Sequence, residues 1–294
     1  MTRPDWKGAW AAIPTPMRDG RIDLKALRTF LHFLLNHHID GIVACGTTGE
    51  AATLTAAEKE SVIVTTLEET GGRVPVIAGV GTNDTRTTLE NAEMTRNLGV
   101  AGLLIVTPYY NKPNQECLYR HFSTIADKID LPQLLYNVPS RTSCKLLVPT
   151  LARLSRHPNI VGTKDATGDM IFASETILEC GPDFLMFSGD DGTTFPFLCL
   201  GGHGTISVVA NVQPQWMHDI CQLTAEGNIR EAARIHGRML PLFRALFSDT
   251  SPIPLKAILS CMDLGIHNEL RSPLFAMEGQ QLEELKMRVQ SLLP

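Results

Sequence analysis

Eight short, mostly unalternating apolar segments recur along this 294-residue chain, and a helical or polar segment follows each of them. A strand without polar alternation is expected to be covered on both faces, as the strands of a parallel sheet are. Eight repeats of strand and helix over about 250 residues are typical of a (β/α)8 barrel. The expected strands lie within residues 8–16, 41–45, 74–80, 102–107, 131–138, 159–163, 184–188 and 205–209.

Helix start signals follow several of these segments. Asp23 precedes leucines at helical spacing, and Thr55 and Glu58 form a capping box, in which each side chain satisfies a free backbone N–H group. Asp84 and the Gly-Asp pair at 168–169 are placed to start two further helices. The spacing therefore predicts that strands and helices alternate.

A doubly wound sheet is the alternative fold. It would need a glycine-rich phosphate turn after a strand, and neither residues 79–84 nor residues 202–207 complete the G-x-G-x-x-G pattern. Strand signals stop after Gly227. We therefore expect a barrel domain over residues 1–227 and a C-terminal helical appendage over residues 228–294, with helices at 228–247, 254–264 and 280–293.

Composition narrows the classes of partner. The net charge is -5, and no basic block is interleaved with aromatic residues, which argues against nucleic acid or an anionic membrane surface. No apolar leader or membrane-length run is evident, so we expect a cytoplasmic protein. The seven cysteines contain no C-x-x-C pair and the nine histidines no H-E-x-x-H pattern, which predicts reduced thiols and no bound metal. Small-molecule substrates are the favoured partners.

Lys164 is the leading candidate for a catalytic group. It ends a β-branched apolar run and stands before a helix start, where strand-to-helix turns of barrel enzymes carry chemistry. An exposed lysine is protonated at neutral pH, whereas burial lowers the pKa and allows the amine to form a Schiff base with a carbonyl compound. The alternative is a structural lysine paired with Asp165.

Residues at the carboxyl ends of the strands of a barrel converge on one cavity. Here they supply an amine, hydroxyl groups that can relay protons, a glycine-rich turn and a guanidinium that suits a carboxylate. That set is suited to carbon–carbon bond chemistry on an oxo acid. The paired carboxylates at 190–191 are interpreted as a solvated turn or a helix start. The strand-end residues are 47–50, 109–111, 136–137 with Arg141, 164–165, 189–191 and Ile206.

With these residues in order, the sequence resembles the pyruvate-dependent class I aldolases, the family of dihydrodipicolinate synthase and N-acetylneuraminate lyase. The resemblance covers nearly the whole chain. A Pro-x-Pro-x-Lys element at 252–256 resembles one in the C-terminal helical region of the family. The motifs that carry the resemblance are GTTGE at 46–50, PYYNKP at 108–113, YNVPSRT at 136–142, KD at 164–165 and GTISVVANV at 204–212.

The resemblance implies that Lys164 forms an imine with pyruvate without any other cofactor, and that the derived enamine attacks aspartate semialdehyde in lysine and diaminopimelate formation. Thr47 would link the proton shuttle Tyr136 to Tyr110, which in this family comes from a neighbouring subunit of a homotetramer built as a dimer of dimers. The remaining implied roles are Thr48 for the pyruvate carboxylate, Arg141 for the semialdehyde carboxylate, and Gly189 and Ile206 for the cavity lining.

The resemblance constrains feedback inhibition and the choice of substrate less than it constrains the type of reaction. Lysine-inhibited synthases carry a histidine at the position of Ala56 and a glutamate at that of Thr87, so the resemblance implies weak or absent inhibition by lysine, although Tyr109 and Asn83 are retained. Another pyruvate aldolase, acting on a deoxy sugar acid, N-acetylneuraminate or hydroxy-oxoglutarate, is an alternative function. A barrel that binds an oxo acid without turnover is a third.

Overall fold

The computed structural model describes residues 3–294, and eight strands form a closed barrel in the order β1-β10-β9-β8-β7-β6-β5-β4. The expected (β/α)8 barrel is therefore confirmed, and the doubly wound alternative is wrong. One short antiparallel hairpin, β2 (Met17–Arg18) with β3 (Arg21–Ile22), was not expected. The barrel strands are β1 (Gly8–Ala12), β4 (Gly41–Ala44), β5 (Val76–Gly79), β6 (Gly102–Val106), β7 (Gln133–Asn137), β8 (Ile160–Asp165), β9 (Leu185–Ser188) and β10 (Gly204–Ser207).

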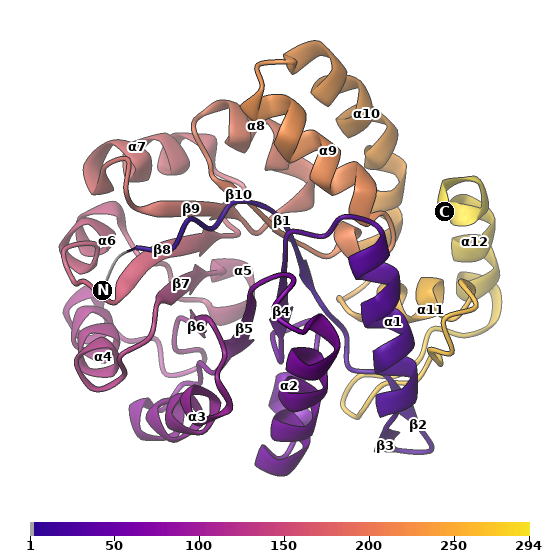
Figure 1. The fold of residues 1–294 in the computed structure, drawn as a ribbon, viewed down its shortest axis with the longest axis horizontal. Helices are drawn as coiled ribbons and strands as arrows, with labels where there is room; N and C mark the ends of the chain where they lie inside the picture. Colours follow the sequence, from indigo (N-terminus) through magenta and orange to yellow (C-terminus); the bar gives the residue numbers. More distant parts are fainter. Residues whose placement is uncertain (1–2) are drawn as a thin grey trace. The chain divides into compact units, whose positions relative to one another are not determined.

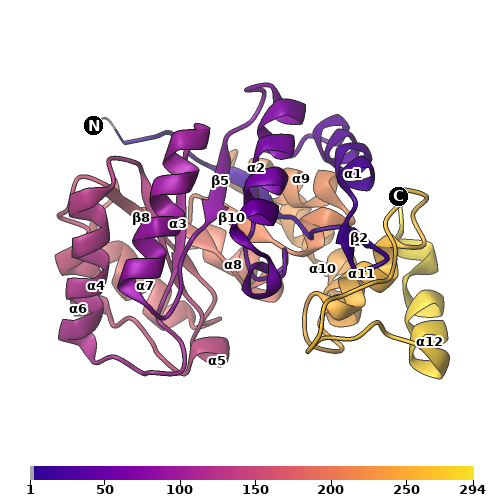
Figure 2. The same ribbon diagram turned by 90° about the horizontal axis from the view of Figure 1, so that it is seen from below.

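One compact unit contains Ile77–Ile206 and the first segment up to Gly8. Within it β7, β8 and β9 run parallel side by side (Figure 1), and the register pairs Lys164 with Tyr136 on one side and with Phe187 on the other. Helices α4 and α6 lie next to each other in Figure 2. The helices of this unit are α3 (Thr85–Leu98), α4 (Gln115–Lys128), α5 (Pro139–Thr142), α6 (Val148–Leu154), α7 (Met170–Cys180), a 3-10 turn at Asp191–Thr193, and α8 (Thr194–Cys199).

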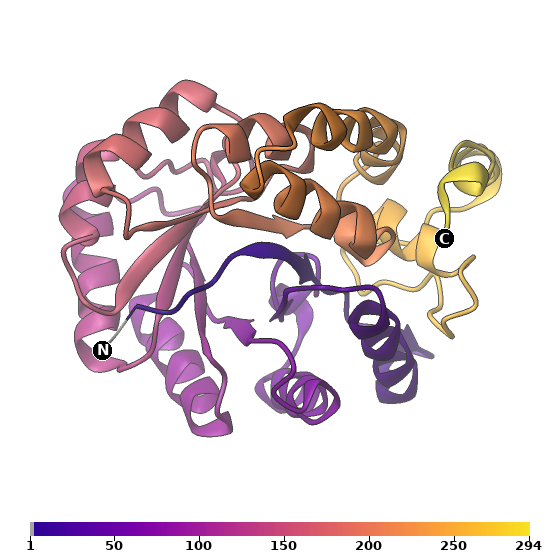
Figure 3. The ribbon, with the colours of Figure 1, turned by 45° about the horizontal axis from the view of Figure 1, so that its top comes forward.

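The other unit contains Ala9–Val76 and Ser207–Pro294. Helices α9 and α10 pack along each other (Figure 3). The boundary expected at 227/228 falls between them, inside this unit, and stays a prediction. The helices are α1 (Leu24–Asn36), α2 (Ala56–Thr70), α9 (Pro214–Ala225), α10 (Ile229–Leu246), α11 (Ile253–Leu259) and α12 (Gly279–Val289), with 3-10 turns at Ala51–Thr53, Val209–Asn211 and Gln290–Leu292.

The predicted helix starts are confirmed. Asp23 accepts a hydrogen bond from the N–H of Ala26, and Thr55 and Glu58 form both bonds of the capping box. Asp84 and Asp169 each accept from two N–H groups in the first turns of α3 and α7. Because these bonds satisfy donors that a helix leaves free, local sequence is sufficient to fix where these helices begin.

Each unit has its own apolar core. Phe122, Phe184 and Phe187 are fully buried in the first unit, as are Trp10 and Phe30 in the second. All seven cysteines are free thiols. Within residues 3–294, no helix combines the length and the apolar character that crossing a bilayer requires.

Candidate active site

Lys164 is buried at the carboxyl end of β8, with 6% of its surface exposed. Burial lowers the pKa of its amine from 10.5 to about 8; the positive charge of Arg141 acts in the same direction, and the carboxylate of Asp191 opposes it. At pH 7 roughly a tenth of such an amine is uncharged, against a few in ten thousand for an exposed lysine. Lys164 therefore has the nucleophilic character that imine formation needs.

Tyr136 stands beside Lys164 on the neighbouring strand. The register pairs the two residues, and the Lys164 Nζ atom lies 4.4 Å from the centroid of the Tyr136 ring. Only 7% of Tyr136 is exposed. The ring of Tyr136 therefore lies against the amine of Lys164, shielded from water.

Gly189 leaves the space that the Lys164 side chain occupies. A Cβ atom at position 189 would lie 2.8 Å from Lys164 Cε and 2.9 Å from the Cβ of Ala166. The backbone N–H of Gly189 donates to the carbonyl of Asp165 at 2.6 Å, which fixes the close approach of the two chain segments. Any other residue at 189 would force the lysine or the chain segments around it to shift.

The carboxylate that acts on Lys164 is that of Asp191, not that of its sequence neighbour. Asp165 instead accepts hydrogen bonds from the N–H and the hydroxyl of Thr167, both at 3.1 Å. The interpretation of 190–191 was right for Asp190, which caps a 3-10 turn by accepting from Gly192 N–H. For Asp191 it was right in part, since this residue starts the same 3-10 turn but is only 2% exposed and is therefore not solvated.

Arg141 projects from α5, a single turn that other side chains hold in place. Asn137 is fully buried, donates to the carbonyl of Leu146 at 3.2 Å and accepts from the N–H of the same residue at 3.0 Å. The Thr142 hydroxyl, next to Arg141, donates to the carbonyl of Cys144 at 2.8 Å. The loop therefore presents an exposed guanidinium on a rigid base, close enough to affect the pKa of Lys164.

The other predicted site residues of the first unit differ in exposure. Ile206 is buried in β10, with 1% exposed. Tyr110 is 89% exposed and adopts left-handed backbone at φ 73°. Tyr110 therefore points into solvent in this single chain and is not gathered around Lys164.

Thr47 and Thr48 belong to the second unit, in the turn after β4. Thr48 is buried and Thr47 is exposed. The turn is closed by two backbone bonds, from Glu50 N–H to the Thr47 carbonyl at 3.1 Å and from Ala51 N–H to the Gly46 carbonyl at 3.3 Å. Backbone N–H groups of such a turn, with the two hydroxyls, suit a carboxylate.

Left-handed backbone recurs at non-glycine residues in the loops that follow the strands. Cys45 (φ 54°) and Glu50 (φ 55°) follow β4, Tyr110 follows β6, and Ser143 (φ 53°) follows β7. Each such residue costs of order 1–3 kcal/mol and persists only where surrounding structure imposes it. The surrounding structure therefore holds these loops in conformations that a simple connection between a strand and a helix would not need.

The geometry agrees with comparisons to known proteins. A model described as the dihydrodipicolinate synthetase family matches residues 5–292. The chain belongs to this family. Its relatives include the 4-hydroxy-tetrahydrodipicolinate synthase of Nitratidesulfovibrio vulgaris strain DP4, which is 44% identical over 282 residues, or 96% of each chain.

Solved structures of the dihydrodipicolinate synthetase family share the fold. A monomeric dihydrodipicolinate synthase variant matches with a TM-score of 0.96 at 40% identity, over 99% of this chain and 98% of that one. The chloride-inhibited enzyme of Acinetobacter baumannii, solved with pyruvate, matches with a TM-score of 0.94 at 39% identity, over 97% and 98% of the two chains. The family resemblance drawn from the sequence is thus confirmed.

Three residues of this family member were given no individual role from the sequence. Asp191 was interpreted as part of a solvated turn or a helix start, although it lies two residues beyond Gly189 at a strand end. Asn137 and Thr142 were not given a role in holding Arg141 in place. Their positions inside the YNVPSRT motif were the available signal, because a buried amide or hydroxyl in a loop usually bonds backbone.

Proposed function

We propose that the chain is a 4-hydroxy-tetrahydrodipicolinate synthase, which condenses pyruvate with L-aspartate 4-semialdehyde in diaminopimelate and lysine biosynthesis. The observation that carries the proposal is the buried amine of Lys164, with its pKa lowered to about 8, beside Tyr136. The relatives named 4-hydroxy-tetrahydrodipicolinate synthase support the choice of reaction.

The chemistry follows from the uncharged amine. Lys164 adds to the ketone carbon of pyruvate and loses water to give an imine, and loss of a proton from the methyl group gives an enamine. The enamine carbon then attacks the aldehyde carbon of the semialdehyde, and the alkoxide takes up a proton. The amino group of the semialdehyde can displace Lys164 from the imine carbon, which closes a ring and restores the free amine. No other cofactor is required.

The proposed residue roles follow from the resemblance to the family. Tyr136 carries protons to and from the group on Lys164. Thr48 holds the carboxylate of pyruvate, and Thr47 connects Tyr136 to Tyr110. Arg141 receives the carboxylate of the semialdehyde, since its planar fork matches two carboxylate oxygens. Gly189, which leaves space for the Lys164 side chain, and the buried Ile206 shape the cavity wall.

Borohydride trapping with pyruvate tests the proposal. The expected result is a mass increase at Lys164, followed in coupled assays by turnover with aspartate semialdehyde. A panel of aldehydes then separates the alternatives: turnover confined to a sugar aldehyde would assign the chain to another pyruvate aldolase. Absence of any adduct would leave a barrel that binds an oxo acid without turnover.

The rate of imine formation should depend on pH through the Lys164 pKa. At low pyruvate concentration the rate should rise about tenfold per pH unit up to about pH 8 and then level off, because only the uncharged amine attacks. The rate of imine formation would be measured at each pH by rapid mixing with pyruvate, followed by a borohydride quench under the same conditions throughout. Replacing Arg141 with leucine should shift the midpoint upward, since the guanidinium lowers this pKa. A rise that continued to pH 10 in the parent protein would contradict the assignment.

Lysine should inhibit the enzyme weakly or not at all. Ala56 is an apolar residue in the first turn of α2, and the Thr87 hydroxyl already donates to Asp84 at 2.6 Å in the cap of α3. Neither residue offers a charge to a bound amino acid. Initial rates at increasing lysine concentration check this, and half-inhibition below one millimolar would show it to be wrong.

The proposal includes a cytoplasmic homotetramer, arranged as a dimer of dimers. An aromatic residue that is 89% exposed, Tyr110, would be covered if it reached a neighbouring subunit. Seven free thiols fit a reducing compartment. Sedimentation velocity should give the mass of four chains, and a monomer with full activity would remove the role assigned to Tyr110.

A further inference from the structure

Lys256 and Glu50 form an ion pair inside the second unit. Lys256 lies in α11 with none of its side chain exposed, and only 2% of the Glu50 side chain is exposed. The Lys256 ammonium also donates to the carbonyl of Glu269 at 2.8 Å. Burial lowers the pKa of Lys256, and the charge of Glu50 opposes that shift. Folding therefore removes two charges from water, and an apolar pair at the same place would have a smaller desolvation cost.

Glu50 is the last residue of the turn that carries Thr47 and Thr48. Its backbone is left-handed, and it follows Gly49, whose carbonyl accepts a hydrogen bond from the Thr15 hydroxyl at 2.7 Å. One oxygen of its carboxylate meets Lys256, and the other accepts from the N–H of Arg271 at 3.0 Å. The side chain of Glu50 therefore ties the turn to two points of the C-terminal segment.

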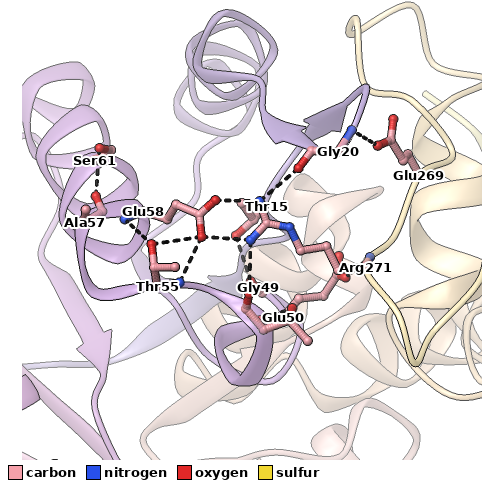
Figure 4. Close-up of polar contacts among 11 residues, drawn as sticks. Thr15, Gly20, Gly49, Glu50, Thr55, Ala57, Glu58, Ser61, Glu269 and Arg271 are labelled. Atoms are coloured by element: carbon pink, nitrogen blue, oxygen red, sulfur yellow. Dashed lines mark hydrogen bonds and ion pairs between the residues drawn. The ribbon is translucent and has the colours of Figure 1, made fainter.

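The C-terminal segment is itself fixed where it meets the turn. The Arg271 guanidinium donates to Glu58, to the carbonyl of Thr53 at 3.0 Å and to the carbonyl of Gly20 at 3.0 Å (Figure 4). Arg271 lowers the pKa of Glu58 to about 2. The carboxylate of Glu269 accepts from Gly20 N–H at 2.6 Å. The anchors for Glu50 are thus bonded to chain segments on either side of the turn, so they can hold it without moving.

We propose that Lys256 and Glu50 are positioning residues that hold the Thr47–Thr48 turn in the form that receives the carboxylate of pyruvate. The claim about pyruvate rests on the proposed function, whereas the claim that the pair holds the turn does not. Lys256 and Glu50 are 206 residues apart in sequence (256 − 50). Because each buried charge needs its partner, the pair allows a single arrangement of the turn against α11. An apolar pair would tolerate several arrangements of the turn.

Two variants separate positioning from stability. Lys256→Met leaves the Glu50 carboxylate buried without its cation, so it should lower the melting temperature and loosen the turn. The double variant Lys256→Met with Glu50→Gln removes the stranded charge and should recover most of the melting temperature, but it restores no link between residue 50 and α11. Met239→Ala is the matched control, because it opens a cavity at a fully buried position of α10.

The measurements are amide hydrogen exchange over residues 46–54 and the KM values of both substrates. In both Lys256 variants we expect exchange in the turn to be about tenfold faster and the KM of pyruvate to rise by about tenfold, while the KM of aspartate semialdehyde changes by less than about threefold. Met239→Ala should lower the melting temperature without either change.

Unchanged exchange over residues 46–54 in both Lys256 variants would overturn the proposal. So would a pyruvate KM that returns to the parent value together with the melting temperature in the double variant, or one that rises equally in Met239→Ala. If the parent protein gives no borohydride adduct with pyruvate, the proposed function fails. The exchange data would still decide whether Lys256 and Glu50 hold the turn.

Discussion

Lys164→Arg should abolish turnover, with kcat reduced by at least about 10⁴-fold and no borohydride adduct with pyruvate. Arginine keeps the positive charge, but its guanidinium has a pKa above 12 and does not lose a proton in proteins. The buried site lowers the pKa of a lysine to about 8, which no substitution by arginine can reproduce. Coupled assays of turnover, with mass spectrometry of the trapped protein, would measure the loss.

Lys145→Arg is the matched control for that variant. Lys145 lies in the same unit. Its Nζ atom is 3.6 Å from a carboxylate oxygen of Asp169 and 4.3 Å from the ring centroid of Phe172. Arginine can maintain both contacts, so imine formation and turnover should stay close to the parent values. If Lys164→Arg kept more than a tenth of the parent kcat, the imine mechanism would have to be abandoned.

Gly189→Ala should reduce kcat/KM by about 10²-fold, because the added methyl group occupies the space of Lys164. The new Cβ would lie 2.8 Å from Lys164 Cε and 3.0 Å from Lys164 Cγ, closer than carbon atoms normally approach. Either the lysine moves or β8 and the segment after β9 separate. Overpacking of this kind also costs about 1–3 kcal/mol of folding free energy. Steady-state kinetics, trapping rates and thermal unfolding would report both effects.

Gly237→Ala makes the same chemical change where space is available. Among residues 3–294, no atom outside the adjoining residues and backbone of the same helix lies within 4 Å of a Cβ built at this position of α10. Alanine in a helix interior is favoured over glycine by roughly 0.5–1 kcal/mol, so this variant should be at least as stable as the parent and fully active. If Gly189→Ala retained a kcat/KM within about threefold of the parent, the close packing of Lys164 would not matter for catalysis.

Local chemistry made much of the fold predictable. Asp23, Asp84 and Asp169 each cap a helix through bonds to residues two or three positions away, so the signal lies within one short window. The two-residue strands β2 and β3 could not be found this way, because they are too short to show a period. The four-residue helix α5 was missed for the same reason.

The nucleophile of the site was predictable, and its electrostatic surroundings were not. Lys164 could be chosen because it ends an apolar run. The contribution of Asp191 depends on the close approach of β8 to the segment after β9, which no pattern in either segment encodes. In the same way, Arg271 and Glu58 are 213 residues apart, and only the folded chain brings them together.

The bonds that hold α5 in place leave room for substrate preference to evolve. Asn137 is bonded to the backbone of Leu146, and Thr142 to that of Cys144, so side chains other than that of Arg141 help to shape this loop. If Arg141 has the role proposed for it, a change of residue at 141 would alter which aldehyde binds, and loss of the guanidinium would also raise the pKa of Lys164. An ancestral barrel with one reactive amine could thus diversify by exchanging a single projecting side chain on an unchanged support.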